Sequence, residues 1–168
     1  MSSLLTADII RIFSKGRGKT LIVCVGNTLR RDDGVGCYIA AQLKSTPQVK
    51  IIDAGFSPEN IIDEAIAFSP KRMIIIDAAD FNGLPGEVRI IAEESIPLTS
   101  VSTHAIPLNV ITGIIKDSVN CEVVFIGIQP EDVSLGEGIC LAVKKTAEEI
   151  IRLLEKNLTR SGRCMKCT

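Results

Sequence analysis

The sequence predicts an α/β domain with three layers, α/β/α, in which helices flank a mostly parallel, mixed five-stranded sheet. Five short apolar, β-branched runs alternate with segments of helical periodicity, which is the pattern of a sheet covered on both faces. A chain of 168 residues suffices for one domain with one core. We therefore expect a single α/β domain over residues 1–157, followed by a polar tail over 158–168 that carries Cys164 and Cys167.

The expected strands are residues 20–25, 49–53, 72–77, 87–91 and 122–128. The connection between the third and fourth runs, residues 80–86, is too short for a crossover helix. We therefore expect the fourth strand to pair antiparallel at an edge, which makes the sheet mixed.

The expected helices are residues 34–44, 58–68, 106–116 and 138–156. The last has an apolar stripe opposite a charged face, as expected of an amphipathic closing helix. Its apolar positions are Ile139, Val143, Ala147, Ile150, Ile151 and Leu154.

Composition excludes several classes of protein. The formal net charge is −1 and the basic residues are scattered, so no nucleic-acid partner is expected. The apolar runs fall far short of the roughly 20 residues that cross a bilayer, and residues 4–13 lack the features of a secretory signal. We expect a cytoplasmic protein without a membrane partner. Four cysteines in apolar or helix-like settings are expected to be reduced: Cys24, Cys37, Cys121 and Cys140.

Residues 25–36 form a glycine-bearing turn between a strand and a helix, with the adjacent acids Asp32 and Asp33. Ligands bind at this edge of open α/β sheets. The glycine spacing does not fit a dinucleotide site, and two aspartates would repel its phosphates. One acid of the pair is explained equally well as a helix cap, because aspartate is favoured there.

Asp77 ends the third run, after three isoleucines that indicate a strand buried on both faces. A carboxylate in that place needs a cation or hydrogen-bond donors. The alternative is a helix cap or loop acceptor. Asp53 also ends a strand and competes for the same role.

His104 is the only histidine, and it precedes a predicted helix in which Pro107 suits an early position. A lone loop histidine is more often structural. If that helix packs on the sheet, however, His104 can lie over the same edge as Asp33 and Asp77. Two carboxylates and one imidazole form a mixed set suited to a borderline divalent ion with open positions.

Other catalytic designs fit less well. The chain has no G-x-S-x-G elbow and no H-E-x-x-H helix, and no cysteine shares a motif with His104. Cys164 and Cys167 have a chelating spacing but make only half of a metal site.

These motifs together resemble the hydrogenase maturation endopeptidases, and the likeness covers most of the chain between Leu21 and Glu149. The opening motif G-N-x-L-x-x-D-D-G-x-G is present from Gly26 to Gly36. The later blocks are D-A-G with P-E-N, I-D-A, G-L-P-G-E-V-R-I-I, T-H with P-L-N, and F-I-G-I-Q-P. They most resemble the branch that serves hydrogenase 3 and formate-linked hydrogenases.

The resemblance implies a twisted sheet and an aspartate- and metal-dependent endopeptidase. Its partner would be the precursor of a nickel-iron hydrogenase large subunit, from which it removes a C-terminal peptide. It implies that nickel, supplied by the substrate, or a surrogate divalent ion is held by Asp33, Asp77 and His104. We expect Asn27 and the amides around Gly34 and Gly36 to position substrate. Two alternatives stay open: an enzyme like peptidyl-tRNA hydrolase, and a non-catalytic metallocentre-assembly chaperone.

Overall fold

The computed structural model describes residues 7, 9–12, 18–91 and 107–161, and side chains as far as Asn157. The strands are β1 (Thr20–Val25), β2 (Val49–Gly55), β3 (Arg72–Ala78), β4 (Val88–Ile91) and β5 (Glu122–Ile128). The α-helices are α2 (Val35–Gln42), α3 (Ile62–Phe68), α4 (Leu108–Val119) and α5 (Leu141–Ser161). Two 3₁₀ helices, η1 (Arg31–Gly34) and η2 (Pro58–Ile61), precede α2 and α3.

The five strands form one sheet in the order β2-β1-β3-β5-β4. β1, β2, β3 and β5 pair in parallel, and β4 pairs antiparallel with β5 at the edge. The predicted mixed sheet and its antiparallel edge strand are therefore confirmed. The chain moves from β1 outward to β2 and then returns to β3 on the other side of β1, so the direction of winding changes between β1 and β3.

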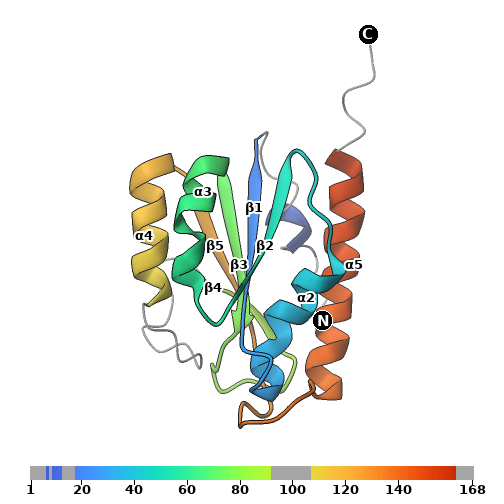
Figure 1. Cartoon of the computed structure of the whole chain (residues 1–168). Helices are drawn as coiled ribbons and strands as arrows, with labels where there is room; N and C mark the ends of the chain where they lie inside the picture. Colours follow the sequence, from blue (N-terminus) through green and yellow to red (C-terminus); the bar gives the residue numbers. More distant parts are fainter. Residues whose placement is uncertain (1–6, 8, 13–17, 92–106, 162–168) are drawn as a thin grey trace.

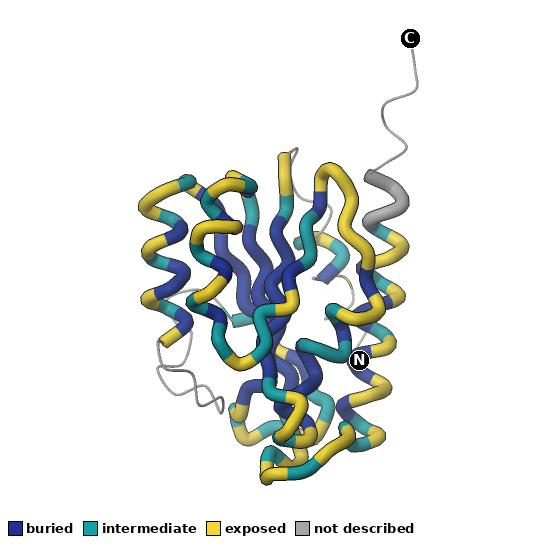
Figure 2. Tube along the Cα trace, viewed as in Figure 1, coloured by how far each residue is buried: buried dark blue, intermediate teal, exposed yellow. Residues whose placement is uncertain are grey.

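Helices cover both faces of this sheet (Figure 1), with α2 and α5 on one side and α3 and α4 on the other. Alternate strand residues point to opposite faces. Ile22 and Ile74 accordingly pack with α2 and α5, whereas Leu21 and Met73 pack with α3 and α4. The strands at the centre of the sheet are buried along most of their length (Figure 2), as their continuous apolar sequences predict.

Helix boundaries differ from the prediction at several places, and α4 ends at Val119 rather than 116. The helix expected over 34–44 begins one turn earlier, as η1, and ends at Gln42. The closing helix begins at Leu141 rather than 138 and continues to Ser161, past the end expected at 156. Five positions of its predicted stripe are confirmed, because Val143, Ala147, Ile150, Ile151 and Leu154 are all buried. The sixth, Ile139, precedes the helix and is half-buried. Cys164 and Cys167 lie outside the described residues.

The four cysteines expected to be reduced are free thiols. Cys24 and Cys121 are buried, while Cys37 and Cys140 are half-buried. In the part of the chain that the structure describes, no helix has the length and apolar character needed to cross a membrane.

Candidate functional site

The carboxyl edge of the sheet, where the winding changes between β1 and β3, carries both predicted acids. Asp77 is the penultimate residue of β3, and Asp33 lies in η1, which follows β1 and contacts β3. Both residues have an exposed fraction of 0%. Ligands of open α/β sheets bind outside the strand ends at such a switch point. The two acids therefore occupy the place where the fold most readily builds a site.

Asp77 is two positions beyond Ile75 and four beyond Met73 on β3, so its side chain belongs to the same sheet face, which α3 and α4 cover. Its Oδ1 accepts a hydrogen bond from the main-chain N–H of Ala78 over 2.8 Å. Helix α4 starts at this same end of the sheet (Figure 1), with Pro107 as its N-cap residue. His104 comes three residues before Pro107 and lies outside the described residues.

The metal site therefore stays a prediction. Among the side chains that the structure describes, no group of three or more His, Cys, Asp or Glu residues is arranged to hold a metal ion. Only Asp33 and Asp77 of the predicted set belong to that part of the chain. The third member, His104, does not, so the observation does not test the set of three.

Asp32, the other acid of the pair, ties two distant segments together. It is 1% exposed. Its Oδ2 accepts hydrogen bonds from the main-chain N–H groups of Glu131 (2.8 Å) and Asp132 (3.2 Å). Its Oδ1 accepts one from the N–H of Cys140 at 2.6 Å. The N-cap residues of η1 and α2 are Arg30 and Gly34, so the alternative that one acid of the pair stands at the helix cap does not hold.

The two segments are also joined through their main chains. Gly136 donates to the carbonyl of Leu29, and Arg31 donates to the carbonyl of Gly136, each over 2.9 Å. Arg31 Nε lies 3.1 Å from Asp132 Oδ2. The loop of residues 131–140 is thereby fixed against the turn that carries Asp33.

The glycines of the opening motif allow main chains to approach closely. A Cβ on Gly36 would lie 1.9 Å from the carbonyl oxygen of Val25, and one on Gly26 would lie 2.2 Å from that of Asp33. Gly34 has Thr28 Cα only 3.0 Å from the place of a Cβ. These contacts hold the start of α2 directly against the end of β1. They explain the glycine spacing by packing, whether or not the amides also contact substrate.

Asn27 shapes the same turn. Its Oδ1 accepts a hydrogen bond from the N–H of Leu29 over 3.0 Å, and its own N–H donates to the carbonyl of Asp33 over 3.1 Å. This is an Asx-type turn, a conformation that asparagine favours. Asn27 therefore supports the segment that presents Asp33.

Asp53, the competitor of Asp77, is exposed at the end of the edge strand β2, one strand removed from the switch point. Its Oδ1 accepts from the N–H of Gly55 over 3.0 Å. Burial, together with a hydrogen bond to Asp53 and its charge, raises the pKa of the Cys37 thiol to about 12. Burial and Asp53 together keep Cys37 protonated, which makes a cysteine nucleophile at this position unfavourable.

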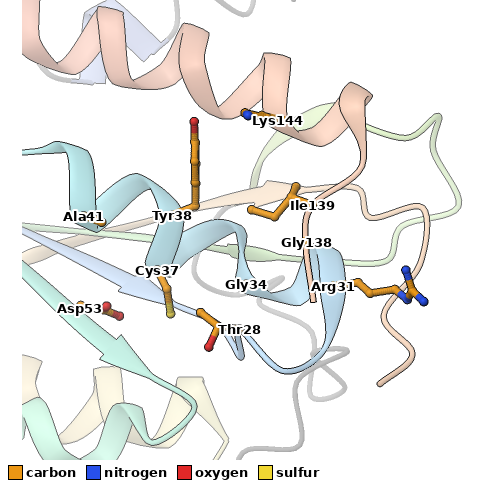
Figure 3. Close-up of a pocket in the computed structure, with 10 residues that line it drawn as sticks. All are labelled: Thr28, Arg31, Gly34, Cys37, Tyr38, Ala41, Asp53, Gly138, Ile139 and Lys144. Atoms are coloured by element: carbon orange, nitrogen blue, oxygen red, sulfur yellow. The ribbon is translucent and has the colours of Figure 1, made fainter. Parts of the chain in front are cut away.

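A cavity of about 640 Å³ opens beside the Asp33 turn (Figure 3). It is bounded by η1, α2, the end of β2, the loop before α5 and the first turn of α5. Its lining residues are Thr28, Arg31, Gly34, Cys37, Tyr38, Ala41, Asp53, Gly138, Ile139 and Lys144. The sequence did not predict this cavity, because its walls come from segments about a hundred residues apart.

Known proteins match both the sequence and the fold. Residues 35–157 match the family model described as hydrogenase maturation protease. The chain is 35% identical over 138 residues to the hydrogenase 3 maturation protease of Escherichia coli K12, covering 80% of this chain and 88% of that protein.

Solved structures agree with these matches. The crystal structure of a [NiFe] hydrogenase maturation protease HycI from Thermococcus kodakarensis KOD1 superposes with a TM-score of 0.80 at 32% identity. That match covers 94% of this chain and 99% of the other. The solution structure of the Escherichia coli endopeptidase HycI gives 0.72 at 34% identity, over 82% and 90% of the two chains.

Proposed function

The chain belongs to the hydrogenase maturation protease family, and on this premise we propose that Asp33, Asp77 and His104 together recognise nickel in the precursor that it cuts. The activity is that of an endopeptidase that processes a hydrogenase large subunit. We propose further that it removes a C-terminal peptide, and that it does so only after nickel has been inserted.

The observation that carries this proposal is the burial of two acids at one switch point. Asp33 and Asp77 are both fully buried, and they come from segments on either side of the change in winding. A buried carboxylate is costly unless a cation or hydrogen-bond donors accompany it. Two such groups at the edge where ligands bind favour a cationic ligand, and oxygen donors suit a divalent ion.

His104 supplies the third donor in this proposal. It is joined to Pro107 by three residues of chain, a reach of at most about 11 Å. Pro107 and the first turn of α4 stand at the carboxyl edge, on the sheet face to which Asp77 belongs. One imidazole nitrogen and two carboxylates leave open positions for ligands from the precursor.

In this proposal the chain's own residues distinguish nickel-loaded precursor from nickel-free precursor. Docking places the precursor's nickel against Asp33, Asp77 and His104, so binding is strong only when the ion is present. A divalent ion bound at this place would polarise the carbonyl of the scissile peptide bond as a Lewis acid. Asn27 and the turn around Gly34 hold Asp33 in place, and the closed packing of Gly36 on Val25 keeps that turn rigid. Such rigidity preserves the geometry on which recognition depends.

Mass spectrometry of a nickel-loaded large-subunit precursor, before and after incubation with the protein, tests the reaction. We expect loss of one C-terminal peptide. An unchanged precursor that nevertheless binds the protein would favour the non-catalytic chaperone. Family membership removes the basis for the alternative of a peptidyl-tRNA hydrolase.

The role of nickel is tested by the same assay on nickel-free precursor. We expect cleavage of the loaded form and little or none of the empty form. Equal cleavage of both forms would contradict recognition through nickel while leaving the protease activity intact.

A further inference from the structure

The cavity beside the Asp33 turn has a definite chemical character. Cys37, Tyr38 and Ala41 of α2 form one wall, and Ile139 lies opposite them (Figure 3). The Cys37 thiol adds no charge at neutral pH, because burial and Asp53 raise its pKa to about 12. The volume of about 640 Å³ is in the usual range for ligand sites and exceeds the needs of one side chain.

Two cations border this cavity, but they differ in their partners. Arg31 is paired with Asp132 at 3.1 Å. Lys144 forms no ion pair with any residue that the structure describes. It extends from the first turn of α5 on the side opposite Asp53 (Figure 3). The cavity therefore offers an apolar wall with a cation, Lys144, on one side and a carboxylate, Asp53, on the opposite side.

The walls are held in place from outside the cavity. Asp32 accepts the N–H of Cys140, the residue that follows Ile139 in the lining. Gly34, also in the lining, is the immediate neighbour of Asp33. An occupant of this cavity would thus lie against the turn that carries Asp33, beside a wall whose position is fixed.

We propose that this cavity is a specificity pocket for the precursor peptide that flanks the scissile bond. It takes an apolar side chain of that peptide against Tyr38, Ala41 and Ile139, and an acidic side chain of the same peptide lies next to Lys144. This assignment rests on the proposed function and names the sequence character of the substrate: an apolar residue with an acid close to it.

Filling the cavity tests whether it binds an apolar side chain of the precursor peptide. Ala41→Leu places a larger side chain inside it, and Ala67→Leu is the matched control. Both alanines are exposed and occupy the penultimate position of a short helix, but Ala67 is on α3, across the sheet. We expect Ala41→Leu to raise KM for nickel-loaded precursor about 10-fold or more, the usual effect of a pocket that is too small. Ala67→Leu should behave as the wild type does.

Removing the charge of Lys144 tests whether an acidic side chain of the precursor peptide lies next to it. Lys144→Met retains an apolar stem, and the neighbouring Lys145→Met is its control, since Lys145 is exposed and does not line the cavity. We expect Lys144→Met to raise KM and to weaken the dependence of KM on salt concentration, because one attractive charge is lost. Lys145→Met should retain the wild-type salt dependence.

The dissociation constant of the precursor is measured by calorimetry with the wild type and the four variants. It distinguishes a failure of the pocket assignment from a failure of the proposed activity. If the wild type binds but never cuts the precursor, the proposed activity fails, and the five dissociation constants still decide the pocket. If the wild type cuts, but Ala41→Leu and Lys144→Met match their controls in both KM and affinity, the pocket assignment is overturned and the protease stands.

Discussion

Asp32 and Cys140, 108 positions apart, are joined by a 2.6 Å hydrogen bond from the main-chain N–H of Cys140 to the carboxylate of Asp32. With the bonds from Glu131 and Asp132, this makes Asp32 the acceptor for three main-chain donors of one loop. The two acids of the opening motif therefore differ in kind. Asp32 organises the loop of residues 131–140, and Asp33 remains the candidate for chemistry.

Replacing Asp32 by alanine should destabilise the fold. The change leaves three donors without their acceptor, and hydrogen bonds to charged groups are among the stronger ones, so we expect a loss of about 3 kcal/mol in the free energy of unfolding. Denaturant titration measures it. Asp117→Ala, at an exposed position of α4, is the control and should change little. Equal stability of the two variants would show that Asp32 does not secure the loop.

Gly36→Ala should be more harmful than its small size suggests. The added Cβ would lie 1.9 Å from the carbonyl oxygen of Val25, so α2 or β1 must move. We expect a loss of about 3 kcal/mol or more. Gly113→Ala on α4 is the opposite case, because its Cβ meets nothing within 4 Å. It should stabilise the protein by about 0.5–1 kcal/mol through helix propensity. Thermal or denaturant unfolding of both variants decides the matter, and a harmless Gly36→Ala would refute the close packing.

The sequence was sufficient for those features that depend on local pattern. Apolar runs predicted the strands β1 to β5 that the structure describes, and the short connection after Asp80 predicted the antiparallel edge. The difference between Asp32 and Asp33 depends instead on amides about a hundred residues away, which no local pattern reveals. The same reason applies to the cavity, because Ala41 and Ile139 meet only in the folded chain.

Cys37 should react slowly with alkylating agents. Burial, and then the hydrogen bond to Asp53, raises its thiol pKa to about 12, whereas a free thiol ionises near pH 8.5. Only the thiolate is nucleophilic, so the alkylation rate at Cys37 should still be climbing between about pH 8 and pH 10, without a plateau. Peptide mass spectrometry reports each cysteine separately.

The Asp53→Ala variant tests the cause of that shift. Removing the carboxylate takes away a hydrogen bond and a negative charge that both favour the protonated thiol. The pKa of Cys37 should fall, and its alkylation at a given pH should accelerate. The raised pKa also makes the free energy of unfolding depend on pH. The stabilisation is complete below about pH 8.5 and is lost progressively above it, because the thiol of the unfolded chain ionises first. A rate that does not change on removing Asp53 would assign the shift to burial alone.

Asp33→Asn and Asp77→Asn should separate activity from stability. Each amide is nearly isosteric with its acid and removes a fully buried charge, so we expect the free energy of unfolding to stay within about 1 kcal/mol or to rise. Cleavage of nickel-loaded precursor should fall about 100-fold or more, as when a group acting on the reacting centre is lost. Asp117→Asn controls for charge. Full activity in either buried variant would remove that residue from the site.

The convergence of the three side chains is tested most directly by anomalous diffraction from a crystal of the protein soaked with a nickel salt. We predict one strong peak at the carboxyl edge of the sheet, about 2 Å from oxygen atoms of Asp33 and Asp77 and from a ring nitrogen of His104. A peak held by Cys164 and Cys167, with His104 directed to another part of the surface, would contradict the account.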